Sequence, residues 1–524
     1  MRGITTPVTK IRRQVFTEIA RLAYEDGDYS RIEELPYTII PGEKANYRDS
    51  VFKERAIVGE RLRLAVGLPL RPVDQHAPVS QGINDSAIAD MFYEPPLINV
   101  ISFACNACEE TSYTVTDLCR NCIAHPCTAV CPVKAVSIVN GRSYIDKSKC
   151  VKCGRCAQAC PYSAIVKSER PCAAACGVDA IESDEYGRAK INYDKCVSCG
   201  QCLVNCPFGA IADKSQIFQM IRAIQAGERV YAAVAPAFVG QFGPKVTPGK
   251  LRAAMKQLGF ADIIEVAIGA DLCAAQEAED FVKEVPEKLP FMATSCCPAW
   301  SVMAKKLFPE QANSISMALT PMTLTARLIK HHQPGAKVAF IGPCAAKKLE
   351  AMRRTVRSEV DFVLTFEEMA GIFEARHIDV NTLKEDPHGV NDASADGRNF
   401  AVSGGVAQAV VNVIKEKYPD QLVMADCDNI ENALACAGAG ADFVGTTMRG
   451  YTPETTGIND VDFGFIAQLA RECPARVIAE GHIHTPEQAV QALYAGAFAL
   501  VVGGAITRPA EITARYTAAI NNHK

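Results

Sequence analysis

The distribution of hydrophobic and polar positions along this chain predicts an α/β protein of several domains. The apolar run VYAAVAPAFVGQFG at 230–243 is consistent with a buried strand that leads into a glycine-bearing turn. Helix-like and strand-like segments alternate after this run, as in an α/β domain, and we place that domain at 216–420. The front of the chain, residues 1–100, contains no cysteine and is expected to be mostly helical.

The last hundred residues repeat this alternation on a regular scheme. Strand-like apolar runs occupy 421–425, 442–446, 476–480 and 498–502. Helical segments follow them, so we predict four βα units over 421–524.

Composition narrows the classes of protein that fit this pattern. The 524 residues suffice for three or four domains, and 48% of them are hydrophobic. The net charge of −4 and the absence of a long basic run argue against nucleic-acid binding. No apolar stretch approaches the roughly 18 residues of a membrane span, and the first 20 residues lack the apolar core of a signal peptide. We therefore expect a soluble, cytoplasmic protein without a membrane partner.

Twenty-three cysteines change this picture, because a reducing compartment disfavours a disulfide framework. Sixteen of them lie between Cys105 and Cys206. The runs CVKCGRCAQACP at 150–161 and CVSCGQCLVNCP at 196–207 have the C-x2-C-x2-C-x3-C-P spacing of bacterial ferredoxins. Zinc is the weaker interpretation, since structural zinc sites use CxxC pairs rather than four-cysteine runs that end in proline.

The remaining cysteines pair with these runs by their spacing. The run CRNCIAHPCTAVCP at 119–132 precedes the first of them, and the split pieces CNAC at 105–108 and CAAAC at 172–176 precede the second. The expected ligand sets are set 1 (Cys119, Cys122, Cys127, Cys160), set 2 (Cys131, Cys150, Cys153, Cys156), set 3 (Cys105, Cys108, Cys172, Cys206) and set 4 (Cys176, Cys196, Cys199, Cys202).

This arrangement predicts one ferredoxin nested within another, over 101–215, with four 4Fe-4S clusters. The alternative is that the split half is degenerate and binds nothing. Four clusters in a row would conduct single electrons between a surface partner, such as ferredoxin or another one-electron carrier, and a buried site.

Two motifs in the α/β domain indicate what that buried site is. TSCCPAW at 294–300 and IGPCAAKK at 341–348 resemble the first two active-site motifs of the iron-only (FeFe) hydrogenases, which work in anaerobic cells. The resemblance covers about 1–420, includes RNFAVSGGVAQAV at 398–410, and is closest to the branch of that family with a split ferredoxin region.

The resemblance assigns roles to individual residues. In the family, four cysteines bind a cubane that is bridged to a diiron subsite, and the resulting H-cluster interconverts protons and H2. Cys297 and Cys344 match two of the cubane ligands, and Cys296 matches the thiol that passes protons to the diiron subsite. Lys347 matches the lysine that donates to a cyanide on the distal iron, a contact suited to a fixed cation.

A proton path is expected to lead outward from Cys296. Ser316 matches the family's relay serine, and Glu277 and Asp280 align with its two relay glutamates if one gap is allowed. The alternative for the two carboxylates is an ordinary solvated face of a helix.

The family's third motif, a CxxxC segment that supplies the last two cubane ligands, has no counterpart here. Residues 421–447 stand in its place, and their cysteines, Cys427 and Cys436, are nine residues apart. The resemblance therefore predicts an H-cluster that is incomplete or absent, unless these two cysteines substitute as ligands.

The region from about 415 to 524 resembles the second half of the N-acetylmannosamine-6-phosphate 2-epimerases, which are TIM barrels. The matching segments are MAD at 424–426, DFVGTTMRGYTP at 442–453, IAEGHIHTPEQA at 478–489 and LVVGGAITRP at 500–509. Glu480 matches the family's acid/base glutamate, and Asp426 and Arg508 match sugar-phosphate contacts. Gly503 and Gly504, before a helix, suit a backbone cradle for phosphate.

Half of this barrel is missing, and with it the catalytic lysine of the family. Four strands cannot close a barrel, so we expect two copies to pair into a homodimer. Three functions follow: a hydrogenase-like oxidoreductase, active or inactive; a redox- or hydrogen-sensing electron-transfer protein; and an epimerase-like enzyme or module that binds a sugar phosphate. The join near 414–423 is either a natural fusion or an erroneous join of two genes, which the reading frame around residue 420 would decide.

Overall fold

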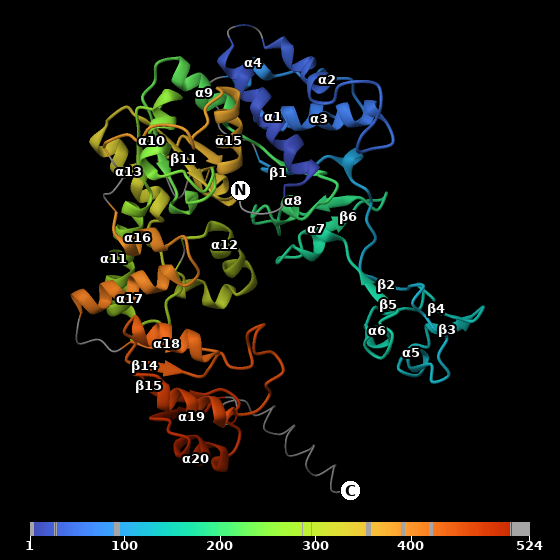
Figure 1. Cartoon of the computed structure of the whole chain (residues 1–524), viewed down its shortest axis with the longest axis vertical. Coiled ribbons are helices and arrows are strands. Elements are labelled where there is room, and N and C mark those ends of the chain that lie inside the picture. Colours follow the sequence, from blue (N-terminus) through green and yellow to red (C-terminus); the bar gives the residue numbers. More distant parts are fainter. Residues whose placement is uncertain are drawn as a thin grey trace. The chain divides into compact units, whose positions relative to one another are not determined.

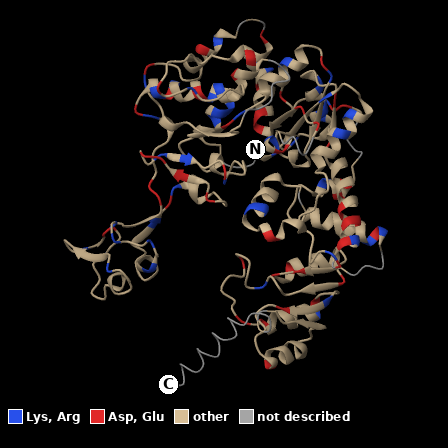
Figure 2. Ribbon diagram, turned by 180° about the vertical axis from the view of Figure 1, so that it is seen from behind, with Lys and Arg blue, Asp and Glu red and all other residues tan. Residues whose placement is uncertain are grey.

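A computed structural model describes most of the chain. The described residues are 5–25, 27, 29–87, 95–285, 287–294, 296–352, 358–388, 393–418, 423–503 and 505. They fall into two compact units, the first within 1–273 and 291–401 and the second within 274–290 and 402–524 (Figure 1). Basic and acidic residues are interspersed along the ribbons of both units (Figure 2). None of the described helices combines the length and the apolar character that crossing a membrane requires.

The first unit begins with helices that pack on its central sheet domain. These are α1 (Pro7–Tyr24), α2 (Leu35–Ile39), α3 (Val51–Ala65) and α4 (Ile83–Ser86). Thr6 caps α1 by accepting a hydrogen bond of 3.3 Å from the Thr9 amide. α1 crosses α15 (Phe366–Ala375) at Gly371, where an added Cβ would lie 2.7 Å from Cβ of Phe16. Only glycine allows the two helices to approach this closely.

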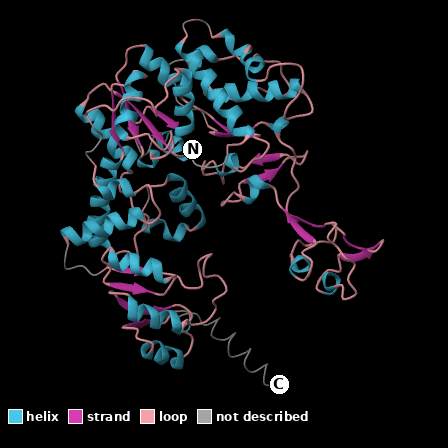
Figure 3. Cartoon of the chain, in the orientation of Figure 1, coloured by secondary structure: helices cyan, strands magenta, loops and turns pink. Residues whose placement is uncertain are grey.

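A parallel four-stranded sheet forms the centre of the first unit (Figure 3). Its order is β10 (Asp262–Glu265), β9 (Val230–Val234), β11 (Lys337–Gly342) and β12 (Phe362–Thr365). The helices that accompany it are α9 (Ile217–Gln225), α10 (Pro248–Gln257), α11 (Ala267–Glu284), α13 (Pro321–His332), α15 and α16 (Ala395–Asn399). The predicted strand at the start of 230–243 is therefore confirmed, and the turn that follows it contains Gly240 with φ of 75°.

The cysteine-rich segment consists of short elements that repeat. Four-residue helices occur at α5 (Pro126–Ala129), α6 (Arg155–Gln158), α7 (Pro171–Ala174) and α8 (Gln201–Val204). Two hairpins separate them, β3 (Val136–Val139) with β4 (Arg142–Ile145) and β6 (Ile181–Ser183) with β7 (Ala189–Ile191).

Two further antiparallel strand pairs enclose this segment, one inside the other. β2 (Ser112–Val115) pairs with β5 (Ile165–Ser168), which encloses the stretch from 112 to 168. β1 (Ile98–Val100) pairs with β8 (Ile211–Asp213), which encloses everything between 98 and 213. Arg170 lies just after the inner strand pair and contacts the segment before it, because its guanidinium donates to the carbonyl of Cys108 at 2.9 and 3.0 Å.

Two more helices, α12 (Pro298–Leu307) and α14 (Ala346–Met352), begin within the TSCCPAW and PCAAKK motifs. Lys348 in α14 is fully buried and donates to Asp213 at 2.7 Å and to Glu368 at 2.8 Å. Burial alone lowers the pKa of this lysine, but the two carboxylates outweigh it, so the pKa is raised from 10.5 and the group stays charged. This ion cluster fastens α14 to β8 and to α15.

The second unit contains a parallel sheet in the order β13 (Met424–Asp426), β14 (Phe443–Gly445), β15 (Arg476–Glu480), β16 (Ala499–Val501). Its helices are α17 (Gly405–Lys417), α18 (Ile430–Gly438), α19 (Phe463–Glu472) and α20 (Pro486–Tyr494). Each of the four runs predicted as strands thus contains a strand in its described residues. Val444 and Val477 pack against Phe465 and Leu469 of α19 in its core. Closure into a barrel with a second copy stays a prediction.

Candidate functional site

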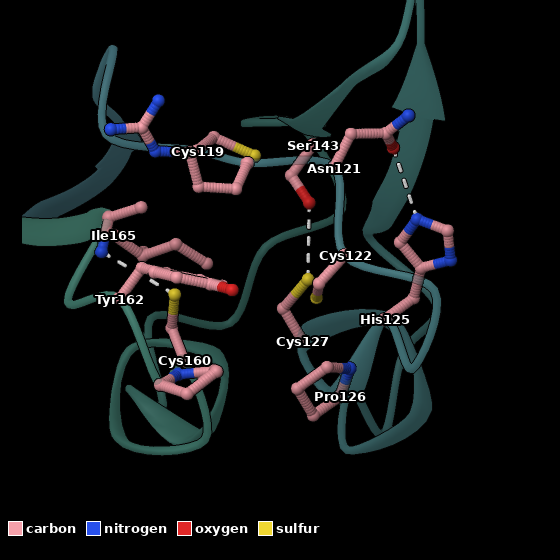
Figure 4. Close-up of a pocket in the computed structure, with 13 residues that line it drawn as sticks. Cys119, Asn121, Cys122, His125, Pro126, Cys127, Ser143, Cys160, Tyr162 and Ile165 are labelled. Atoms are coloured by element: carbon pink, nitrogen blue, oxygen red, sulfur yellow. Dashed lines mark hydrogen bonds between the residues drawn. The ribbon is translucent and has the colours of Figure 1, made fainter.

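The cysteines of set 1 surround one cavity of the first unit. Cys119, Cys122, Cys127 and Cys160 all line it, together with apolar groups such as Ile165 (Figure 4). Their sulfur atoms face a common space, and Sγ of Cys127 lies 3.1 Å from Oγ of Ser143. The structure thus brings together four thiols that are spread over 42 positions of sequence, from 119 to 160.

Three further groups of four cysteines converge in the same way. Set 2 lines a second cavity and set 3 a third. The thiols of set 4 lie close enough to interact electrostatically. Burial raises the pKa of Cys202 to about 12, and the neighbouring thiolates of Cys196, Cys199 and Cys176 raise it further. Each set predicted from spacing is therefore also a spatial set.

The four sets share one backbone geometry. Each short helix carries a buried cysteine as its second residue, namely Cys127, Cys156, Cys172 and Cys202. The last cysteine of each run accepts an N–H···S bond from the alanine four residues later: Ala135 to Cys131 at 3.2 Å, Ala164 to Cys160 at 3.4 Å, Ala180 to Cys176 at 3.3 Å and Ala210 to Cys206 at 3.4 Å.

A left-handed residue precedes each of these alanines and turns its N–H toward the sulfur. The φ angles are 52° at Lys134, 50° at Ser163, 48° at Asp179 and 57° at Gly209. Three of the four are not glycine, so the chain accepts a strained backbone at the same step each time. Cys176, which lacks the proline that follows the other three cysteines, keeps this geometry, so the split half is built like the intact runs.

The thiols surround spaces rather than points. Within the described ranges, no group of three or more His, Cys, Asp or Glu side chains is arranged to hold a single metal ion. A tetrahedral zinc site would need its sulfurs about 2.3 Å from one centre. Cysteine thiols that line an apolar cavity, with backbone N–H groups donating to their Sγ atoms, are the donor set that iron–sulfur clusters use.

The TSCCPAW and PCAAKK motifs lie together in the first unit. Cys297 caps α12, Cys344 precedes α14, and these two thiols are close enough to interact: burial, and then the Cys297 charge, raise the pKa of Cys344, while Lys347 opposes the rise. Lys347 Nζ donates to the carbonyl of Cys296 at 2.9 Å. Cys296, Cys297, Cys344 and Lys347 therefore lie together, and their roles stay a prediction.

Glu350 belongs to this site, although the sequence reasoning missed it. Its carboxylate accepts from Lys347 at 2.7 Å, its side chain is only 4% exposed, and it also accepts hydrogen bonds from Thr320 and Thr323. The available signal was its position three residues after Lys347 on a helix, where the two side chains share a face. The ammonium of Lys347 is thus held by a carboxylate on one side and a carbonyl on the other.

Set 4 lies against this site. Val197 of set 4's run packs in one cluster with Ala299 of α12 and Ala346 of α14, and Cys199 and Cys344 contact that cluster. A Cβ added to Gly200 would lie 3.8 Å from Cβ of Ala345. Sets 3 and 4 also adjoin, since Cys172 is among the groups that raise the pKa of Cys202.

The expected proton path is only partly brought together. Ser316 is buried beside the first motif, where its N–H donates to the carbonyl of Ala293 at 2.8 Å. Glu277 and Asp280 lie on the part of α11 that belongs to the second unit. Glu277 is 1% exposed, which does not fit a solvated face, and Asp280 accepts from Gln276 at 2.9 Å. Their role in a relay stays a prediction.

In the second unit, Asp426 and Glu480 come together at the carboxyl ends of β13 and β15. Thr447 donates to Asp426 at 2.7 Å, and burial together with the charge of Asp426 raises the pKa of Glu480 while Thr447 lowers it. Gly503 follows β16 and is exposed, and Gly504 and Arg508 lie outside the described residues. Cys427 and Cys436 lie in the apolar core of this unit with Cys473.

Comparisons with protein families divide the chain along similar lines. The family "Iron only hydrogenase large subunit, C-terminal domain" matches residues 228–453, and "Putative N-acetylmannosamine-6-phosphate epimerase" matches 389–522. Within the cysteine-rich segment, "4Fe-4S binding domain" matches 143–166 and "LdpA Fe-S cluster-binding domain" matches 166–217.

Individual relatives agree with these families. Iron hydrogenase 1 of Clostridium pasteurianum is 32% identical over 302 residues, which cover 52% of this chain and 51% of the relative. A putative N-acetylmannosamine-6-phosphate 2-epimerase of Pediococcus pentosaceus is 49% identical over 113 residues, 21% of this chain and 49% of the relative. The chain therefore spans about half the length of each. A solved FeFe-hydrogenase structure from Chlamydomonas reinhardtii aligns at 26% identity over 36% of this chain and 53% of that one, with a TM-score of 0.31.

Proposed function

We propose that this chain, which joins a region similar to the iron-only hydrogenases to a region similar to the N-acetylmannosamine-6-phosphate epimerases, is an iron–sulfur oxidoreductase. The observation that carries the proposal is the fourfold repetition of one thiol geometry, with a buried cysteine on each short helix and an N–H···S bond at each last cysteine. It exchanges single electrons with ferredoxin or a similar carrier.

Sets 1 to 4 fit 4Fe-4S clusters in their donor chemistry. Sets 1 to 3 each offer four thiols around an apolar space, the thiols of set 4 lie close to one another, and backbone N–H groups donate to sulfur in every set, as in cluster sites whose potentials such bonds adjust. When bound, the clusters supply one-electron transfer. The protein holds them at fixed neighbouring positions, with set 3 beside set 4 and set 4 beside Cys344.

Beyond set 4, the residues of the TSCCPAW and PCAAKK motifs provide a positive charge and a thiol that exchanges protons. Lys347 offers a fixed cation, oriented by Glu350 and the carbonyl of Cys296, toward an anionic ligand. Cys296 offers a thiol that exchanges protons, with Ser316 beyond it as the next relay group. Only Cys297 and Cys344 are available as ligands there, so we propose that the H-cluster is incomplete or absent and that electron transfer or redox sensing is what remains.

The number of clusters is directly measurable. Anaerobically reconstituted protein is expected to carry about 16 iron atoms, four for each set. Cys172→Ser should remove about four of them, because a cubane that loses one of its four thiolates is no longer held. Iron and acid-labile sulfide analysis, with EPR of the reduced protein, measures this.

The matched control is Cys273→Ser, which changes a buried cysteine of α11 outside every set and should leave the iron content unchanged. If Cys105, Cys108 and Cys172 can each be replaced without loss of iron, the split half binds no cluster and the nested arrangement is wrong.

A second function, sugar-phosphate binding by the second unit, is favoured by the convergence of Asp426, Thr447 and Glu480 at the strand ends. β13 and β16 are the outer strands of the described sheet, and β16 exposes 39% of Val501. We expect the chain to sediment as a homodimer through these edges and still not to epimerise N-acetylmannosamine 6-phosphate, because neither copy supplies the family's lysine.

Sedimentation equilibrium measures the assembly. Val501→Lys puts a charge on the edge strand and should favour the monomer, whereas Val490→Lys, at a comparably exposed valine of α20, should not. A wild-type monomer at high concentration, or epimerisation by the unmodified chain, would contradict the expectation.

A further inference from the structure

A large cavity lies in the first unit away from the motifs described above. Its volume is about 700 Å³, and its walls come from α1, α3, the residues before α3, and residues 203–208, which include Cys206 of set 3. Most of this wall is apolar, with Val8, Ile40, Ile57, Val58 and Leu203 among its residues. Val204 lies at its edge and is 72% exposed, so the cavity is reached from solvent there.

Three arginines give this apolar cavity a positive charge. Arg12, Arg48 and Arg61 all line it, and Glu54 is the one acidic residue in the lining that the structure describes. Glu54 offsets one of these charges: one of its oxygens accepts the backbone N–H groups of Asn46, at 2.9 Å, of Tyr47, and of Arg48, at 2.7 Å, and its other oxygen is buried without a hydrogen-bond partner among the described residues. Arg12 is paired outside the lining, with Glu367 at 2.5 Å.

Arg48 and Arg61 keep donors that protein groups do not use. Nη2 of Arg48 donates to the carbonyls of Ala104, at 3.0 Å, and Phe208, at 2.6 Å, and Nη2 of Arg61 donates to that of Gly209. No other hydrogen bond to these guanidiniums is found in the described part of the chain. Their remaining nitrogen atoms are not among the buried atoms that lack a partner, so a water-sized molecule can reach them. Arg61 is only 6% exposed in total, so its free donors face the cavity.

The three cations also repel one another. Like charges in one cavity repel, and the guanidiniums of Arg12, Arg48 and Arg61 all line it. A buried cation is costly unless an anion is near it, and a guanidinium fork matches carboxylate and phosphate oxygens. An oxyanion in the cavity would relieve this repulsion and occupy the unused donors.

We propose that this cavity is a binding site for an amphipathic organic anion, with its oxyanion head on Arg48 and Arg61 and its apolar body against Val58 and Leu203. The volume admits a body of about ten carbon atoms, at roughly 30 Å³ for each small group. The site lies beside set 3, since Cys206 also lines the cavity, but the proposal does not depend on the iron–sulfur function or on the epimerase-like unit.

The test uses decanoate and decyl phosphate as anionic probes and 1-decanol as their neutral match. Isothermal titration calorimetry of the full chain, reconstituted anaerobically, is expected to show one site per chain for the anions and at least tenfold weaker binding of the alcohol. Added salt should weaken the anions more than the alcohol, because the head contacts are ionic.

Two variants locate the site. Val204→Glu adds a negative charge at the exposed edge and should weaken decanoate several-fold, whereas Val204→Gln, of the same size, should bind like the wild type. Arg48→Gln should weaken decanoate about tenfold, with circular dichroism as the check on folding. The proposal is overturned if decanoate shows no saturable binding, if decanol binds equally well, or if Val204→Glu and Arg48→Gln both bind like the wild type.

Discussion

Expressed with hydrogenase maturation factors, this chain is expected to evolve no hydrogen above the background of the assay. The reason is coordination chemistry: a cubane needs four protein ligands, and the site offers Cys297 and Cys344. The cysteines that follow them in the chain are Cys427, Cys436 and Cys473, and these are core residues of the second unit. Electrons that reach set 4 therefore have no diiron site to reduce protons. Hydrogen evolution with reduced ferredoxin, followed by gas chromatography, is the measurement.

A variant in which the missing cysteine ligands are restored distinguishes two causes of inactivity, the lack of ligands and a failure to fold. Replacing the chain after Gly405 with a segment that carries CxxxC should recover hydrogen evolution, and Cys297→Ser in that variant should abolish it again. Hydrogen evolution by the unmodified chain that is lost on Cys297→Ser would overturn the prediction and show that other groups complete the site.

The largest effect on stability is expected from Lys348→Met. Removal of the ammonium leaves Asp213 and Glu368 as buried carboxylates without their cation, and breaking a buried ion pair in this way costs about 3–5 kcal/mol. Guanidinium unfolding, followed by the fluorescence of Trp300, the only tryptophan of the chain, measures the change in the first unit.

Lys305→Met removes an exposed lysine of α12 and should change stability by no more than about 0.5 kcal/mol. Asp213→Asn, added to Lys348→Met, should restore part of the loss, since one unpaired charge is then gone. Because the pKa of Lys348 is raised above 10.5, its contribution is complete below that pH and is lost as pH rises through the folded value. A loss under about 1 kcal/mol for Lys348→Met would contradict the assigned role.

The sequence predicted most where chemistry is local. Spacing alone grouped the twelve cysteines of the three contiguous runs, because a short helix and a left-handed turn fix the positions of neighbouring thiols within a run. The pairing of Cys105 and Cys108 with Cys172 needed an argument from symmetry, since the order of the sequence separates them by a whole inserted segment. The structure gave the reason for their proximity: β1 pairs with β8, and Arg170 holds the Cys108 carbonyl.

Other features depend on contacts that no local pattern specifies. Lys347 and Lys348 are adjacent and identical in type, yet one donates to Cys296 and Glu350 in the candidate site and the other is sealed in an ion cluster with Glu368. Successive helical residues point about 100° apart, and only tertiary packing decides which direction is solvent, site or core. The arginine-lined cavity was equally invisible, because α1, α3 and the loop 203–208 contribute to it from distant parts of the chain.

The pairing of β2 with β5 has a consequence for how such a chain can change over evolutionary time. Ser112 and Ser168 are Cα partners at the open end of that ladder, so the 57-residue insert that begins at one and ends at the other leaves the surrounding fold within one strand spacing of where it departed. The host backbone need bridge only that short gap, whatever the insert contains. A cassette with this property can be gained, lost or exchanged for one of another length without changing the register of β1 on β8, just as inserted domains with neighbouring termini are tolerated elsewhere. The number of electron carriers is therefore a parameter that a single recombination event can alter.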